Sequence, residues 1–187
     1  MPSSYLLEIE PLDLGEDVQA VGLDLAEFDE VREPVRGADA AVIWSRVLPA
    51  VAGPELWALD FFSHLDRLRE YCLRHQIEFR DAASRTIVIP SPDPAPLAAL
   101  FEQFQRETFG ARAGGPLLEG DAALENELSR RGADAYHAEF RKYFFCAICD
   151  FEEGSLTFLS KRLWPGEILR RVRPVLTGLN VEVHLPV

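Results

Sequence analysis

The chain has 187 residues, 48% of them apolar, which suffices for the core of one domain, so we expect a single globular domain over residues 1–187. It carries 31 acidic and 19 basic side chains, a formal net charge of −12. A field of this sign repels phosphate groups, which argues against nucleic acids and anionic membrane surfaces as partners.

The N-terminus, MPSSYLLEIEPLDLGED, lacks the cationic segment and the long apolar core of a secretory signal. The longest uncharged apolar run, Tyr143–Cys149, is far shorter than the ~18 residues that span a bilayer. Three cysteines form no disulfide framework. We therefore expect a cytoplasmic protein with reduced thiols, whose oligomeric state the sequence does not specify.

The first 50 residues contain a strand signal, an ambiguous acidic segment and a helix signal. Residues 4–12, SYLLEIEPL, predict a strand that Pro11 closes. The apolar residues of 13–37 follow neither the strand nor the helix period. A helix is predicted from Ala38, and the apolar residues on its buried face are Ala40, Trp44, Val47, Leu48 and Val51.

A second, longer helix is predicted from Pro54 to His75, because proline suits the first turn of a helix. Its apolar stripe has helical spacing and comprises Phe61, Leu65, Leu68 and Cys72. This spacing directs Cys72 into the core, where a thiol behaves as a small hydrophobic group.

The middle of the chain predicts a hairpin, a helix and a loop. IEFRDAASRTIVIP, residues 77–90, has the pattern of a β-hairpin with its turn at Asp81–Ser84. SPDPAP then starts a helix, capped by Ser91 or Asp93. Residues 110–120 contain four glycines and a proline, which predicts a flexible surface loop or a lid.

The last 50 residues predict a hairpin from Tyr143–Phe151 and Leu156–Leu163, a helix from Pro165 to Gly178 and a final strand. In that strand Leu179, Val181, Val183 and Leu185 would face the core. A hairpin followed by a helix thus occurs at 77–109 and again at 143–177, and a weak internal duplication is one explanation. The predicted fold class is α+β, an antiparallel sheet built from hairpins with helices packed mainly on one face.

The segment YFFCAICDF, residues 143–151, contains the spacing C-x-x-C. In a strand, residues three apart point to opposite faces, so Cys146 and Cys149 could converge on a metal only by breaking the strand. A redox pair would sit at a helix N-terminus, and the acidic neighbours here disfavour a thiolate. We predict that both cysteines serve packing and that the protein holds no metal and no cofactor.

Four polar residues of the predicted second helix are of the types found in catalytic sites. The residues at positions i, i+4, i+7 and i+11 of the predicted second helix form a polar stripe: Asp60, His64, Arg67 and Tyr71. An aspartate that orients a histidine, beside an arginine and a tyrosine, suits general acid–base chemistry or anion binding. The alternative is an ordinary polar flank of an amphipathic helix.

Charge is unevenly distributed along the chain, since residues 1–60 contain 13 acidic and three basic side chains. The acidic candidates for binding a partner are Asp24, Glu27 and Glu30. The basic candidates are Arg170, Arg171 and Arg173, which could bind a small anion or pair with the acidic residues of positions 1–60.

No G-x-S-x-G, Walker A, G-x-G-x-x-G, H-E-x-x-H or EF-hand pattern occurs in the sequence. We therefore expect a non-catalytic binding or interaction protein, for example an inhibitor or immunity-type protein that binds a basic protein partner. The alternative is a small-molecule-binding protein or an enzyme, with a pocket near residues 110–120 and the polar helix stripe.

Overall fold

The computed structural model describes residues 5–13, 19–29, 31–52, 55–59, 65–83, 86–90, 93–103, 109–111, 145–150, 154–160 and 164–185. In chain order the elements are β1 (Tyr5–Asp13), β2 (Gln19–Glu27), α1 (Gly37–Ala52), β3 (Glu55–Leu59), α2 (Leu65–Arg74), β4 (Arg80–Ala83), β5 (Thr86–Pro90), α3 (Pro94–Gln103), β6 (Phe109–Ala111), β7 (Phe145–Asp150), β8 (Ser155–Ser160), α6 (Pro165–Val175) and β9 (Val181–His184).

The strands form one sheet in the order β4-β5-β3-β6-β7-β8-β2-β1-β9. All neighbouring pairs are antiparallel except β1 and β9, which run parallel. The α+β class is confirmed, whereas the expectation of a purely antiparallel sheet is wrong at this edge. A parallel neighbour requires a crossover connection, and α6 supplies it between β8 and β9.

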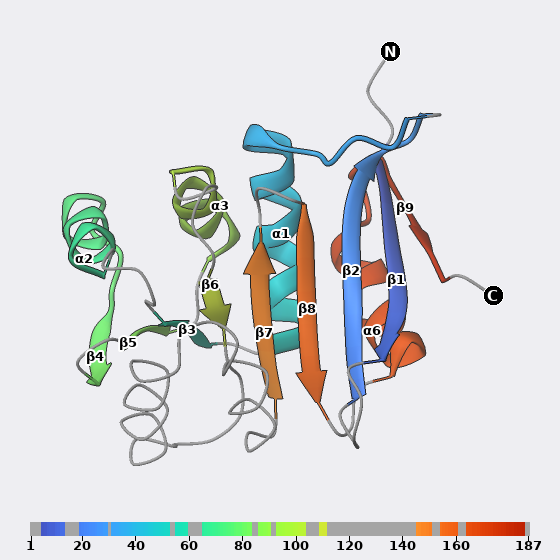
Figure 1. Ribbon diagram of the computed structural model, residues 1–187. Coiled ribbons are helices and arrows are strands. Elements are labelled where there is room, and N and C mark those ends of the chain that lie inside the picture. The colour runs from blue at the N-terminus through green and yellow to red at the C-terminus, as the bar shows by residue number, and fades with distance from the viewer. Residues whose placement is uncertain are drawn as a thin grey trace.

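The helices α1 and α6 lie behind strands β7, β8, β2 and β1 (Figure 1), and they cover one face of this half of the sheet. Strand side chains alternate, so the residues buried under these helices are Leu7, Ile9, Val21, Leu23, Leu25, Leu156 and Phe158. The predicted face of α1 is buried as well: Ala40, Trp44, Val47, Leu48 and Val51. Helix α3 packs against α1, and Leu97, Leu100 and Phe101 extend the core toward β5.

The helix predicted from Pro54 to His75 is wrong in its first part. Residues Glu55–Leu59 form β3, which pairs with β5 and β6, and helix α2 begins only at Leu65. A short apolar run such as ELWAL fits a buried strand and a buried helix turn equally well, and here its pairing with two strands decided the structure. The later part is confirmed, because Leu68 and Cys72 are buried in the core.

Three smaller expectations also differ. Strand β1 continues past Pro11 to Asp13, which is tolerated because β9 pairs only as far as Glu8 and leaves Pro11 at an edge. Strand β4 extends through Ala83, so three of the four residues of the predicted turn, Asp81–Ser84, belong to the strand instead. Leu185 is exposed rather than in the core, since it follows the last paired residue of β9.

The hairpin between β7 and β8 depends on Gly154. Its φ of +69° lies in the left-handed region, and a Cβ at this position would stand 2.9 Å from the backbone oxygen of Leu25. The carbonyl of Gly154 in turn accepts a hydrogen bond from the Leu25 N–H at 2.9 Å. This turn therefore holds β8 against the end of β2, next to the loop that carries the candidate site.

Candidate functional site

The chain leaves β2 through a loop, residues 27–33, that returns to the sheet before α1. Two backbone bonds close it, from Glu27 N–H to the Glu33 oxygen (2.9 Å) and from Val35 N–H to the Leu25 oxygen (3.1 Å). The carboxylate of Asp29 accepts from the N–H groups of Val31 and Arg32, at 3.0 and 2.8 Å. Such a side-chain turn fixes the loop conformation locally.

A charged contact anchors the loop to the sheet. Arg32 has a φ of 53°, which is uncommon for a residue with a side chain, and its guanidinium donates to Glu8 of β1 at 2.8 Å. The ion pair bridges the loop and the first strand.

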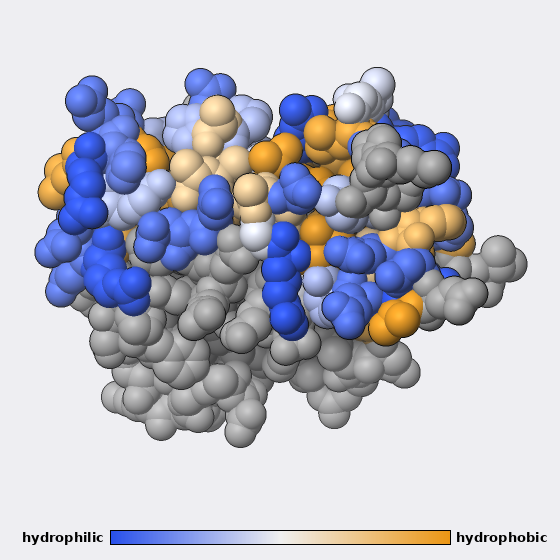
Figure 2. Space-filling model, turned by 90° about the horizontal axis from the view of Figure 1, so that it is seen from above, coloured by the Kyte–Doolittle hydropathy of each residue, from blue (hydrophilic) through white to orange (hydrophobic). Residues whose placement is uncertain are grey.

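The loop presents apolar side chains to solvent among acidic ones. Phe28 is 51% exposed and Val31 is 72% exposed, while Glu27, Asp29 and Glu33 are also exposed. A surface cavity of about 310 Å³ opens beside them, lined by Leu6, Glu27, Phe28, Asp29 and Arg32. Seen from this end of the molecule, apolar atoms alternate with strongly hydrophilic ones (Figure 2).

The acidic character continues onto the sheet face that α1 and α6 leave uncovered. Asp24 on β2 pairs in register with Glu8 on β1, which places two carboxylates opposite each other. Partial burial, followed by repulsion from Glu10 and Glu8, raises the pKa of Asp24. Of the predicted acidic candidates, Asp24 lies on this sheet face and Glu27 is the exposed last residue of β2, whereas Glu30 lies outside the described residues.

The predicted basic candidates lie on α6, where two of them share one carboxylate. On α6, Arg170 and Arg171 both bind Glu167, with nitrogen–oxygen distances of 2.8 and 2.9 Å. Hydrogen bonds from Arg170 and Arg171 lower the pKa of Glu167 to about 2. The carboxylate that both arginines bind thus belongs to their own helix, and Arg173 is exposed on the same helix.

Two residues of the polar stripe predicted for the second helix, Arg67 and Tyr71, lie on α2 four positions apart. The other two, Asp60 and His64, lie outside the described residues. The Tyr71 ring stacks on His75, with centroids 4.2 Å apart. Burial, with smaller effects of Cys72 and Glu102, raises the pKa of Tyr71, so this hydroxyl stays protonated at neutral pH.

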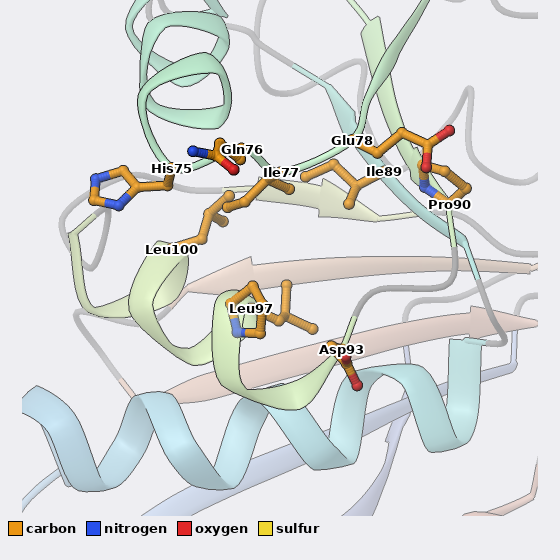
Figure 3. Close-up of a pocket in the computed structure, with 10 residues that line it drawn as sticks. His75, Gln76, Ile77, Glu78, Ile89, Pro90, Asp93, Leu97 and Leu100 are labelled. Atoms are coloured by element: carbon orange, nitrogen blue, oxygen red, sulfur yellow. The ribbon is translucent and has the colours of Figure 1, made fainter.

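Two adjoining pockets flank His75. A polar pocket of about 240 Å³ lies between α2 and the end of α3 and is lined by Arg67, Glu70, Tyr71, Arg74, His75 and Gln103. A second pocket of similar volume has an apolar floor (Figure 3) and is lined by His75, Gln76, Ile77, Glu78, Ile89, Pro90, Asp93, Pro96, Leu97 and Leu100.

Two further expectations concern the cysteines and the glycine-rich segment. Cys146 and Cys149 lie in β7, the predicted strand, and their side chains are outside the described part of the chain. Among the described residues, no group of three His, Cys, Asp or Glu side chains is arranged to hold a metal ion. Gly110 and Ala111 belong to β6 rather than to a loop, and 112–120 lie outside the described residues.

Sequence reasoning missed Phe28, Val31 and Arg32 of the loop, and His75 and Gln103 of the pockets. An aromatic residue between acidic ones, in EFDEV, was the available signal for the loop. Comparisons with protein-family models, with curated proteins and with solved structures found no match. Within the described ranges, no helix combines the length and the apolar character needed to cross a membrane.

Proposed function

We propose that this chain is a non-catalytic binding protein that recognises a basic protein partner through the 27–33 loop and the adjoining acidic sheet face. An inhibitor or immunity-type protein is one concrete form of this function. The observation that carries the proposal is the exposure of Phe28 and Val31, at 51% and 72%, between exposed carboxylates on a loop tied down by hydrogen bonds.

Each part of this surface has a role in recognition. Apolar side chains, aromatic ones above all, act as anchors when a partner buries them, and the cavity beside Phe28 offers room for an apolar group of the partner. The carboxylates of Glu27, Asp29 and Glu33 favour lysine and arginine around that anchor. Since hydrogen bonds already hold Asp29, Val31 and Arg32 in place, their association with a partner loses less conformational entropy than that of unanchored residues.

Affinity capture from cell lysate tests this function, with the protein immobilised at low ionic strength and again at 0.5 M salt, where the Debye length is about 4 Å. We expect a basic protein to be retained only at low salt. The variant Glu27→Gln/Asp29→Asn/Glu33→Gln should lose it, and the side-chain amide that Asp29→Asn introduces still offers an oxygen to the loop N–H groups.

The matched control is Glu78→Gln/Asp93→Asn/Glu102→Gln, which removes the same number of charges from exposed positions elsewhere. It should retain the partner. Equal loss in both triple variants would mean that only net charge matters, and retention by both would exclude the loop as the binding surface.

A further inference from the structure

The two pockets share His75 as a lining residue, and we consider them together as one groove along α3. The residues of α3 and its N-terminal flank that line them are Asp93, Pro96, Leu97, Leu100 and Gln103. Their spacing of i, i+3, i+4, i+7 and i+10 places them on one side of the helix. Ten residues at 1.5 Å each give the groove a length of about 15 Å. His75 lines both pockets, so it marks where the polar end joins the apolar part.

The groove changes chemical character along its length. The end near Gln103 is lined by the guanidinium groups of Arg67 and Arg74 and by the carboxylate of Glu70, and Glu102 is near enough to raise the pKa of Tyr71. At the other end, beside the start of α3, the charged groups among the described lining residues are the carboxylates of Glu78 and Asp93.

Between these ends the floor is aliphatic. It consists of the buried side chains of Ile89, Leu97 and Leu100 and the partly buried side chain of Ile77 (Figure 3). In this view Leu97 and Leu100 face Ile77 and Ile89 across the pocket, while the His75 ring lies at its edge.

We propose that this groove binds a small organic anion with an apolar body, its carboxylate or phosphate at Arg67 and Arg74 and its body over the aliphatic floor. Guanidinium groups bind both kinds of oxyanion through paired N–H donors. The acidic groups of Glu78 and Asp93 repel an anion at the opposite end, which fixes the orientation of the ligand.

Two considerations set the expected selectivity. The long-range field of a chain with net charge −12 opposes anions, so binding must come from contacts within the groove. Each methylene of the ligand that leaves water raises affinity by up to about fourfold, so a short anion such as acetate binds far more weakly than an eight-carbon one.

Titration of the isotope-labelled protein with octanoate, followed by amide chemical shifts, tests the proposal, with octyl phosphate as the second anion. We expect saturable shifts in residues 67–78 and 93–103 for both anions. Acetate and octylammonium, which lack the body or the negative charge, should bind at least tenfold more weakly. Octylammonium binding as tightly as octanoate, or shifts confined to other elements, would overturn the proposal.

The variant Arg67→Gln/Arg74→Gln should weaken octanoate at least tenfold, whereas Arg173→Gln, on the exposed side of α6, should leave its affinity unchanged. If the double variant fails to fold, the single variant Arg74→Gln tests the site, and it should lower the affinity for octanoate at least threefold. Unchanged affinity in a folded variant contradicts the assigned site. The groove and the 27–33 loop involve different residues, so the failure of one assignment leaves the other standing.

Discussion

The guanidinium of Arg171, on α6, donates a hydrogen bond of 3.2 Å to the carbonyl oxygen of Val51 in the last turn of α1. Arg46 of α1 makes the converse contact, at 3.4 Å, to the carbonyl of Val175 at the end of α6. The two helices run in opposite directions, and each supplies an arginine to the other's C-terminus. Carbonyl groups there lack partners within their own helix, and a cation is favoured beside them.

The first prediction concerns this exchange of arginines. Arg46→Met and Arg171→Met keep most of the aliphatic stem but remove the donor, so each should lower the free energy of unfolding by about 1 kcal/mol. Arg170→Met, which loses only an exposed ion pair with Glu167, should lower the free energy of unfolding much less. Urea titration measures all three, and equal effects would show that the carbonyl contacts contribute nothing.

The second prediction concerns the β7–β8 turn. Gly154→Ala should destabilise the fold by roughly 1–3 kcal/mol, because alanine is strained at positive φ and its Cβ would meet the Leu25 oxygen. Gly166→Ala is the matched control, since no atom lies within 4 Å of its added Cβ and alanine favours the helix. A thermal melt in which both variants behave alike would contradict the described turn.

The third prediction concerns Cys72, whose thiol is fully buried and whose pKa burial raises to about 11. Cys72→Ser places a hydroxyl in an apolar environment and should cost on the order of 1–3 kcal/mol. Cys72→Ala introduces no polar group and should be the milder change. Denaturant titration distinguishes the two variants. A serine variant as stable as the wild type would mean that this face of α2 is accessible to solvent.

The fourth prediction concerns pH. A raised pKa means that folded Asp24 holds its proton more tightly than the unfolded chain does, so its favourable contribution exists below the unfolded value, 3.8, and disappears as pH rises through the folded value. Ionised Asp24 is therefore destabilising at neutral pH. Asp24→Asn should raise the free energy of unfolding at pH 7 by a few tenths of a kcal/mol, up to about 1 kcal/mol.

This gain should shrink as pH falls toward 3.8, because the wild-type carboxyl group is then protonated as well. Glu78→Gln, at an exposed position between α2 and β4, serves as the control for a loss of charge. Melts of the wild type and both variants between pH 3 and 8 measure the effect. A gain for Asp24→Asn that is constant over this range would show that Asp24 does not experience its acidic neighbours.

Elements with a clear period could be predicted from the sequence. The buried face of α1 and the two hairpins follow from spacing alone. Strand β3 could not be predicted, because its five residues become a strand only by pairing with β5 and β6, which are distant in sequence. The parallel direction of β9 likewise depends on where α6 returns the chain.

The acidic residues of the candidate site could be predicted from the sequence, but its conformation could not. Its acidic residues stood out by composition, but the 27–33 loop is shaped by contacts that no local pattern encodes, chiefly the Glu27–Glu33 backbone bond and the Arg32–Glu8 pair. The groove exists because α2 and α3 lie close together in the fold, which the sequence does not reveal. Of the residues that line its polar end, the sequence pattern identifies only Arg67 and Tyr71 as site candidates.

Photo-crosslinking from position 28 tests the proposed partner-binding surface most directly. Benzoylphenylalanine in place of Phe28 keeps an aromatic side chain on the loop, and the same probe in place of Leu73, which is 69% exposed on α2, is the control. At low salt we expect position 28 to crosslink one basic protein, position 73 to crosslink none of it, and excess unlabelled wild-type protein to compete. Equal crosslinking of that protein from both positions, or none from position 28, would contradict the account.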